Sequence, residues 1–330
     1  MPSLPIGRRA SVRVRLPAGG VSTDVVGTIT AADDHTVTLR RSDCSTERLL
    51  RRDVVAARLL ADAGPPRRTD GEQLQRLAAV AWPAPVTEPL GDWLLRAAGG
   101  FTGRANSASV SGDPGAPVAE ALHSIQRFYA RHELPARAQV VSGSRWESVF
   151  TGAGWQPAGG GAGAPYPGAV VLTATVAEAL AACSPVDPVP VREQLSDEWL
   201  QRYSRTAAML RAGDDLTAAR QVLTGRAALQ AGSVDAVGLA QLDAAPGQPA
   251  LAVGRMVVIG AWASMACVEV APGHRGEGLG QRVVRTLLSW SQAHGARWCF
   301  LQMLPDNAAA LALYASYGFR EHSSYRYLSP

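Results

Sequence analysis

The chain has 330 residues, of which 47% are hydrophobic, and its 32 basic and 28 acidic residues give a formal net charge of +4. This length exceeds one ordinary domain and supplies enough apolar residues for two or three cores, so we expect a multidomain globular protein. The basic excess falls well short of a nucleic-acid-binding footprint and no polybasic tail is present, so we expect no nucleic-acid partner.

The N-terminal residues carry Arg8 and Arg9 but lack an apolar core of signal-peptide length. The sequence also has no run of about 18 apolar residues, the length that predicts a membrane span. The cysteines lie far apart, without a C-x-x-C pair or a nearby histidine cluster; they are Cys44, Cys183, Cys267 and Cys299. We therefore predict a cytoplasmic protein with buried thiols, no metal and no membrane partner.

Residues 8–60 have the pattern of a small β module. Alternating runs such as residues 11–15 and 35–39 are separated by glycine and Asp-Asp turns. This pattern resembles a compact barrel of the Src-homology-3 (SH3) type, which we place at residues 1–62. Residues 63–70, with Gly64-Pro65-Pro66, change composition abruptly and are predicted to be a linker.

Residues 71–182 form the next predicted domain. A helix is expected at residues 118–125 and a strand at 138–141, followed by Phe150 and the pair Gly154-Trp155. Residues 159–165, which are almost all glycine and alanine, predict a flexible loop. A second linker is predicted at residues 183–190.

The last predicted domain covers residues 191–330. It begins with a mainly helical stretch at residues 197–229, and a strand pair follows at 237–242 and 250–253 across the turn Pro246-Gly247. These elements lead into a strand that ends at Val270.

A glycine-rich turn follows that strand and opens a helix. Gly276, Gly278 and Gly280 let backbone N–H groups approach an anion closely, because no Cβ blocks the way. Apolar residues then recur at helical spacing, from Leu279 to Val283, so the unpaired first N–H groups of the helix point at the same place. The pattern predicts a pyrophosphate site, to which Arg275 and Arg282 add positive charge.

Two other phosphate motifs do not fit this turn. A P-loop needs a Gly-Lys-Ser/Thr ending, which is absent, and so a nucleotide triphosphatase is disfavoured. A Rossmann site needs G-x-G-x-x-G and a carboxylate about 20 residues onward, whereas these glycines alternate and the strand near Leu301 carries no acidic residue.

The turn resembles the acetyl-coenzyme A loop of the GNAT acetyltransferases, Arg/Gln-x-x-Gly-x-Gly/Ala, through Arg275, Gly278 and Gly280. Further motifs of that family follow in the same order, with Asn307 before a short helix, Tyr314 within it and Gly318-Phe319 after it. The resemblance implies a mixed α/β (α+β) GNAT fold with a central mixed sheet flanked by helices. It also implies acetyl-CoA as the co-substrate.

The middle segment resembles a degenerate copy of the same fold. Placing Gly154-Trp155 on Gly318-Phe319 brings Phe150 opposite Tyr314, and phenylalanine has no hydroxyl to donate a proton. The equivalent loop, residues 111–117, contains Asp113 and two prolines instead of the glycine pattern, so we expect no coenzyme there. A competent half joined to a degenerate half resembles mycothiol-synthase-like tandem GNAT proteins.

The resemblance implies which residues carry the chemistry. Strand backbone groups pair with the pantetheine arm and the loop holds the phosphates; the coenzyme-binding residues are then Val268, Glu269, Val270, Arg275, Gly276, Glu277, Gly278, Leu279, Gly280, Gln281 and Asn307. Tyr314 is the predicted acid, since a phenol can protonate the departing thiolate. Asn307 either contacts the coenzyme or caps the helix.

The general base is harder to assign. Some protein-acetylating relatives carry a glutamate at the position of Gln302, which cannot accept a proton. Glu269 is the nearest carboxylate, and it acts directly, acts through water, or is only a solvated or ion-paired side chain. His274 is expected to support the turn. Trp262, Tyr325 and Tyr327 either line an acceptor pocket or pack in the core; strand aromatics favour the core, so they are not entered as site residues.

These observations predict an N-acetyltransferase that transfers an acetyl group from acetyl-CoA to a primary amine, most simply that of a small molecule. A peptide or protein N-acetyltransferase is one alternative. A non-catalytic acetyl-CoA sensor or scaffold is the other, motivated by Gln302 and by the appended β module.

Overall fold

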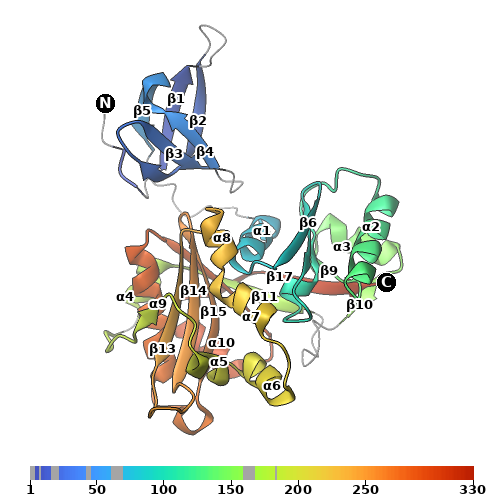
Figure 1. Ribbon diagram of the computed structural model, residues 1–330, viewed down its shortest axis with the longest axis vertical. Helices are drawn as coiled ribbons and strands as arrows, with labels where there is room; N and C mark the ends of the chain where they lie inside the picture. Colours follow the sequence, from blue (N-terminus) through green and yellow to red (C-terminus); the bar gives the residue numbers. More distant parts are fainter. Residues whose placement is uncertain are drawn as a thin grey trace.

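The computed structural model describes residues 4–6, 9–15, 22–41, 46–60, 70–158, 168–182 and 184–330. The strands form a five-stranded sheet near the N-terminus and a twelve-stranded sheet in the remainder, with helices flanking the larger sheet (Figure 1). The predicted loop at 159–165, most of the first linker, Cys44 and Cys183 lie outside the described residues.

The N-terminal sheet is antiparallel throughout, with the strand order β4-β3-β2-β1-β5. Its strands are β1 (Arg9–Arg15), β2 (Ser22–Ala32), β3 (Thr36–Arg40), β4 (Thr46–Leu50) and β5 (Val54–Leu59), with a short 3₁₀ turn, η1 (Arg51–Asp53). The alternating pattern buries Val12, Ile29 and Leu39 on one face, as period-2 patterning predicts. The predicted β module is therefore present, whereas its likeness to an SH3 barrel stays a prediction.

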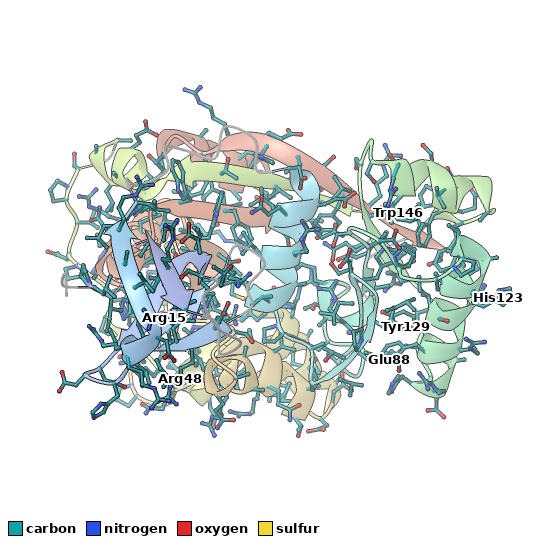
Figure 2. All side chains as sticks on the ribbon, turned by 90° about the horizontal axis from the view of Figure 1, so that it is seen from above. Arg15, Arg48, Glu88, His123, Tyr129 and Trp146 are labelled. Atoms are coloured by element: carbon teal, nitrogen blue, oxygen red, sulfur yellow. The ribbon has the colours of Figure 1, made fainter. Side chains whose placement is uncertain are left out.

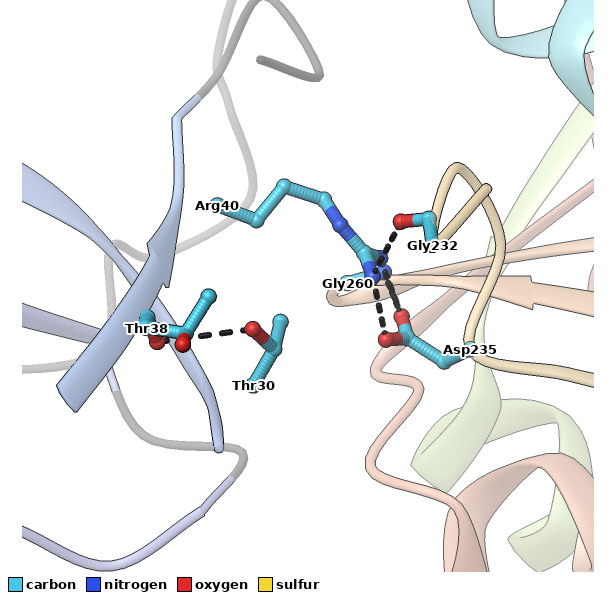
Figure 3. A network of polar contacts seen from close by, with 6 residues as sticks. All are labelled: Thr30, Thr38, Arg40, Gly232, Asp235 and Gly260. Atoms are coloured by element: carbon cyan, nitrogen blue, oxygen red, sulfur yellow. Dashed lines mark hydrogen bonds and ion pairs between the residues drawn. The ribbon is translucent and has the colours of Figure 1, made fainter. Parts of the chain in front are cut away.

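Arg40 joins this sheet to the rest of the molecule. Its guanidinium donates from Nη1 to Asp235 Oδ2 at 2.5 Å and from Nη2 to Asp235 Oδ1 at 2.6 Å, and Nη2 also donates to the Gly232 carbonyl at 3.1 Å (Figure 3). Asp235 is itself held by the N–H of Gly260. The Arg40 side chain is only 6% exposed, and its bidentate pair with Asp235 forms a specific contact between the N-terminal sheet and the rest of the molecule.

The middle segment begins with α1 (Gly71–Ala81) and ends with α4 (Val176–Ala181). Between them lie β6 (Val86–Leu90), β7 (Trp93–Ala97), η2 (Arg104–Asn106), β8 (Ala108–Ser109), α2 (Val118–Arg131), β9 (Ala138–Val141), α3 (Arg145–Gly152), β10 (Gln156–Pro157) and β11 (Gly168–Thr175). Helix α2 is amphipathic, with Tyr129 fully buried and His123 pointing away into solvent (Figure 2). The predicted helix and strand of this segment are confirmed.

The C-terminal segment supplies the elements around the predicted turn. They are β12 (Val191–Arg192), α5 (Asp197–Arg202), α6 (Ser204–Ala212), α7 (Thr217–Thr224), α8 (Arg226–Gln230), β13 (Ala236–Leu242), β14 (Ala252–Ile259), β15 (Trp262–Val270), η3 (Pro272–His274), α9 (Leu279–Ala293), β16 (Trp298–Met303), α10 (Ala308–Ser316) and β17 (Arg320–Ser329). The predicted helical stretch and strand pair are confirmed. Helix α9 lies close against β14 at Gly254. A Cβ added there would come within 2.6 Å of Val283 and 2.8 Å of Leu287.

Both segments share the twelve-stranded sheet, whose main path runs β12-β13-β14-β15-β16-β11-β17-β9-β8-β7-β6. Strand β11 of the middle segment lies between β16 and β17 of the C-terminal segment. The far half of β17 pairs with β9 of the middle segment. The segments thus exchange strands, and neither has a complete sheet without the other.

The two segments repeat the same order of elements. In each, a strand leads through a loop into a helix and then into a parallel neighbouring strand, β8 with β9 and β15 with β16. A second helix then ends in a left-handed glycine and an aromatic residue. The N–H of Trp155 donates to the Phe150 carbonyl, as the N–H of Phe319 donates to that of Tyr314. The predicted internal repeat therefore has a structural counterpart.

Candidate active site

The turn between β15 and α9 presents unpaired backbone donors. Gly276 and Gly278 have φ angles of +86° and +79°, in the left-handed region that favours glycine. The first helical bond runs from Arg282 N–H to the Gly278 carbonyl. Within the part of the chain that the structure describes, the N–H groups of residues 276–281 donate to no protein acceptor. These donors at a helix N-terminus form an anion-binding concavity.

Side chains around the turn hold it in place. His274 Nδ1 lies 3.0 Å from Glu277 Oε2, and this contact braces the turn from outside. Tyr317 donates its hydroxyl to the Gln281 carbonyl at 2.9 Å and so ties α10 to the first turn of α9. Arg282 donates from Nε to the Asp187 carbonyl, whereas the Arg275 side chain is exposed. Arg275 is therefore the more accessible charge for a bound phosphate.

Strands β15 and β16 separate just before this turn. Their parallel pairing begins at Trp262 with Trp298 and ends at Met265 with Leu301. Beyond that point, β15 continues along β14 and β16 continues along β11. The gap opens into a cleft of about 260 Å³, and the strand edge at residues 266–270 keeps backbone groups available for a ligand.

Cys267 lies in a β-bulge at the point of separation. Its φ is +58°, and the register between β14 and β15 shifts beside it. Burial raises the pKa of the Cys267 thiol to about 11 and also raises the pKa of its neighbour Tyr203. Both groups remain protonated near neutral pH, so Cys267 is not an activated nucleophile.

The cleft has walls from both repeats. Val268, Gln302, Asn307 and Tyr314 come from the C-terminal repeat on the side of the turn. The walls also include Thr102 and Arg104 from the loop after β7, Tyr203 and Arg205 at the start of α6, and Tyr325 and Tyr327 of β17. The predicted acid Tyr314 and coenzyme ligand Asn307 thus meet in one cavity.

Tyr314 is 7% exposed and its ring packs edge-on against Phe319 at 5.7 Å. Burial raises the pKa of its phenol above the ordinary value, so the hydroxyl keeps its proton. Asn307 caps α10, with Oδ1 accepting from the Ala310 N–H at 3.1 Å. Its Nδ2 has no acceptor among the described residues, so the capping role leaves the amide donors free.

Glu269 does not line the cleft. Its Oε2 accepts from the Ser204 N–H at 2.8 Å, which places the carboxylate at the positive end of α6. Gln302 does line the cleft, and its Oε1 accepts from Arg104 Nη1 at 3.0 Å. No aspartate, glutamate or histidine is among the described residues that form the walls.

Several cleft residues were not predicted as site residues. Tyr325 and Tyr327 were assigned to the core, yet they line the cavity, whereas Trp262 packs against Trp298 and Phe300. Arg104 and Arg205 come from distant segments that only the tertiary fold brings to the cleft. Cys267 carried no local signal for its left-handed conformation, since it is neither glycine nor asparagine.

The described residues contain no group of His, Cys, Asp or Glu side chains arranged to hold a metal ion. Among those same residues, no helix combines the length and apolarity needed to cross a bilayer.

Known proteins resemble the chain over most of its length. "Probable histone acetyltransferase Rv0428c" of Mycobacterium tuberculosis is 28% identical over 98% of this chain and 95% of its own length. "Uncharacterized N-acetyltransferase YobR" of Bacillus subtilis is 26% identical over 78% of this chain and 98% of its own. A tandem GNAT protein from the clavulanic acid biosynthesis pathway shares the fold, with a TM-score of 0.50, 16% identity, and coverage of 78% of this chain and 87% of that one.

Residues 70–328 match the family described as "Probable histone acetyltransferase Rv0428c C-terminal". That stretch includes both repeats, the glycine turn and the cleft. The chain therefore belongs to this family and is an acetyltransferase of the GNAT type.

Proposed function

We propose that this chain is an acetyl-CoA-dependent N-acetyltransferase acting on the primary amine of a small molecule. The observation that carries the proposal is the row of unpaired N–H groups at residues 276–281, which follows strand β15, whose residues 265–268 line the cleft between β15 and β16. The turn fits a pyrophosphate, and the separated strands fit an extended arm.

Acetyl-CoA supplies the activated acetyl group, and the chain binds and orients it. Residues 276–281 hold the phosphates together with Arg275, while backbone groups of residues 268–270 pair with the arm. The free Nδ2 of Asn307 contacts that arm. Tyr314, kept protonated by burial, donates its proton to the departing thiolate.

Glu269 is proposed as the base only through intervening water, since its Oε2 is already engaged by Ser204. The variant Glu269→Gln separates the two roles, because an amide oxygen still accepts from that N–H but cannot take a proton. If Glu269 relays the proton, the variant lowers kcat about 100-fold. An unchanged kcat with unchanged thermal stability leaves Glu269 as a helix-capping group alone.

A small acceptor is favoured by the small volume of the cleft, about 260 Å³, and by its walls, which come from both repeats. A protein acceptor is the competing proposal, motivated by the relative named as a probable histone acetyltransferase. A sensor without turnover is the other, because the walls carry no carboxylate.

The test is thiol release from acetyl-CoA with a panel of small amines and with a lysine-rich peptide, alongside calorimetric titration of acetyl-CoA. All 32 basic residues of the chain are arginine, so any acetyl-lysine formed belongs to the added peptide. Turnover of a small amine supports the proposal. Tight binding with no turnover of any acceptor would identify a sensor, and no binding would overturn the assignment entirely.

A further inference from the structure

The cleft and its surroundings contain several arginines. Arg104 and Arg205 line the cavity itself, and Arg96 and Arg255 lie buried in the surrounding interior. None of these side chains is ion-paired with an acidic group among the described residues. The cavity is thus surrounded by positive charge that the protein leaves uncompensated.

Arg104 is held in a fixed orientation. Its guanidinium stacks on the ring of Trp82 at 4.3 Å from the centroid, and Nη1 donates to the neutral Gln302 amide. A planar guanidinium has five N–H donors in a fork that matches a carboxylate or a phosphate. One of these donors is used by Gln302. The stacking on Trp82 fixes the plane of the guanidinium and so the direction in which its other donors can meet a ligand.

Arg205 is the second cationic group of the cleft. It is half-buried near the start of α6, and its side chain makes no hydrogen bond or ion pair with a described residue. The carboxylate of Glu269, from β15, accepts from the Ser204 N–H at the start of this helix and forms no ion pair with Arg205. Arg205 is therefore free to meet an anion that enters the cleft.

The buried arginines behind the cleft raise its positive potential. Arg255 is fully buried and, among the described residues, donates only to the carbonyls of Leu223, Val222 and Ala81. Its Cζ lies 5.0 Å from the centroid of the Trp82 ring. Arg96 donates to Ser107 and to the Gln139 amide oxygen. Burying such charges without a counter-ion is costly, and an anionic ligand nearby reduces that cost.

We propose that the acceptor carries an anionic group, a carboxylate or a phosphate, close to the amine that is acetylated, and that Arg104 and Arg205 bind this group. The inference rests on the proposed function and names its substrate class. The same charges disfavour a lysine-rich tail, because like charges repel in a cleft of low dielectric. They also lower the pKa of a bound ammonium group, which supplies neutral amine at a site whose walls lack a carboxylate.

The first test uses acceptors in matched pairs that differ only in the anion: glycine with glycinamide, 4-aminobutyrate with butylamine, and O-phosphoethanolamine with ethanolamine. We expect kcat/KM to be at least about 10-fold higher for the anionic partner, equivalent to about 1.4 kcal/mol. The carboxylate and phosphate pairs show which anion is preferred. Equal rates within pairs, or preference for a lysine-rich peptide, would overturn this inference and leave the acetyltransferase function standing.

A second measurement does not depend on turnover. N-acetylglycine and N-acetylglycinamide, as product probes, are titrated against protein saturated with coenzyme A. Binding of the carboxylate at least about 10-fold tighter than binding of the amide is expected. Equal binding, or no binding of either probe, contradicts the inference. Failure of coenzyme A itself to bind would instead contradict the proposed function.

The variants Arg205→Gln and Arg205→Lys test the residue directly. Arg205→Gln is expected to raise KM for the anionic acceptor about 10-fold without changing the KM of acetyl-CoA, and Arg205→Lys is expected to recover part of the loss. Arg211→Gln, on the exposed part of the same helix, is the charge-matched control. Equal effects of Arg205→Gln on both members of a pair, or the same effect from Arg211→Gln, would assign Arg205 a structural role only.

Discussion

The two repeats contain equivalent loops that use their backbone donors in opposite ways. In the C-terminal repeat, the N–H groups of residues 276–281 are open. In the middle repeat, Gly112 donates to Glu72 Oε2, Asp113 to Asp92 Oδ2 and Gly115 to Asp113 Oδ1, each at 2.8 Å. Carboxylates of the protein therefore occupy three N–H groups of the middle loop and bring negative charge to the place where a phosphate would sit.

The two loops differ in their free N–H groups although the surrounding scaffold is the same in both repeats. The C-terminal ends of α3 and α10, the second helix of each repeat, are closely alike. Phe150 lies edge-on to Trp155 at 4.9 Å, and Tyr314 lies edge-on to Phe319 at 5.7 Å. The middle repeat keeps the packing but lacks the hydroxyl, and carboxylates hold three N–H groups of its loop. It contributes, among other groups, β11, which completes the C-terminal sheet, and Arg104, which reaches the cleft.

The largest expected effect comes from removing the hydroxyl that distinguishes the two helices. Tyr314→Phe should lower kcat by about 100-fold or more, because general acid catalysis contributes on that scale, while acetyl-CoA affinity is unchanged. Burial raises the pKa of Tyr314, so the acid form persists as the pH rises and the wild-type rate should not fall between pH 8 and 10. Steady-state kinetics against pH with calorimetry measures both. A fall in rate within that range, or an unchanged kcat in the variant, would remove Tyr314 as the acid.

The reciprocal change, Phe150→Tyr, is the matched control. Phe150 is fully buried, so an added hydroxyl there is left without a partner and should destabilise the protein by about 1–3 kcal/mol. It should give no gain in activity, since carboxylates of the protein hold three N–H groups of the neighbouring loop. Denaturant unfolding and the same kinetic assay test this pair.

A negative charge placed in each loop tests the comparison next. Gly278→Asp should weaken acetyl-CoA binding about 100-fold, because the carboxylate competes for the anion site and aspartate tolerates a left-handed conformation better than most residues. Gly115→Asp introduces the same charge at a φ of +67° and should leave acetyl-CoA affinity unchanged. If the two variants weaken binding equally, the two loops are not functionally different.

The parts of this site that depend on local chemistry could be predicted from sequence. The open turn depends on Gly276 and Gly278, and the cap of α10 depends on Asn307, so adjacent residues carry the whole signal. Arg104 and Arg205 could not be predicted, because their place in the cleft depends on how distant segments meet. The exchange of β11 and β17 was also hidden, since alternation along a strand does not specify its partner. In the sequence, the resemblance of the repeats rests on the order of the predicted elements and on the pairs Gly154-Trp155 and Gly318-Phe319.

A smaller effect separates the two roles of Asn307. Asn307→Ser keeps an oxygen that can cap α10 but removes the Nδ2 donors, whereas Asn307→Ala removes both. We expect both variants to weaken acetyl-CoA binding about 10-fold, as loss of a donor to a ligand does. Only Asn307→Ala should also lose about 1 kcal/mol of stability. Unchanged affinity in Asn307→Ser would leave the residue as a helix cap, like Ser144 at the start of α3 in the middle repeat.

The smallest expected effect comes from releasing donors in the middle loop. Glu72→Ala frees the Gly112 N–H and should cost about 1 kcal/mol of stability, measured by denaturant unfolding. It should not create a second acetyl-CoA site, because Pro114 and Pro117 have no N–H and Asp92 and Asp113 still bind the neighbouring amides. Calorimetry should therefore give the same stoichiometry as the wild type. A second binding event would mean that one carboxylate alone keeps the middle repeat from binding the coenzyme, and that its prolines matter little.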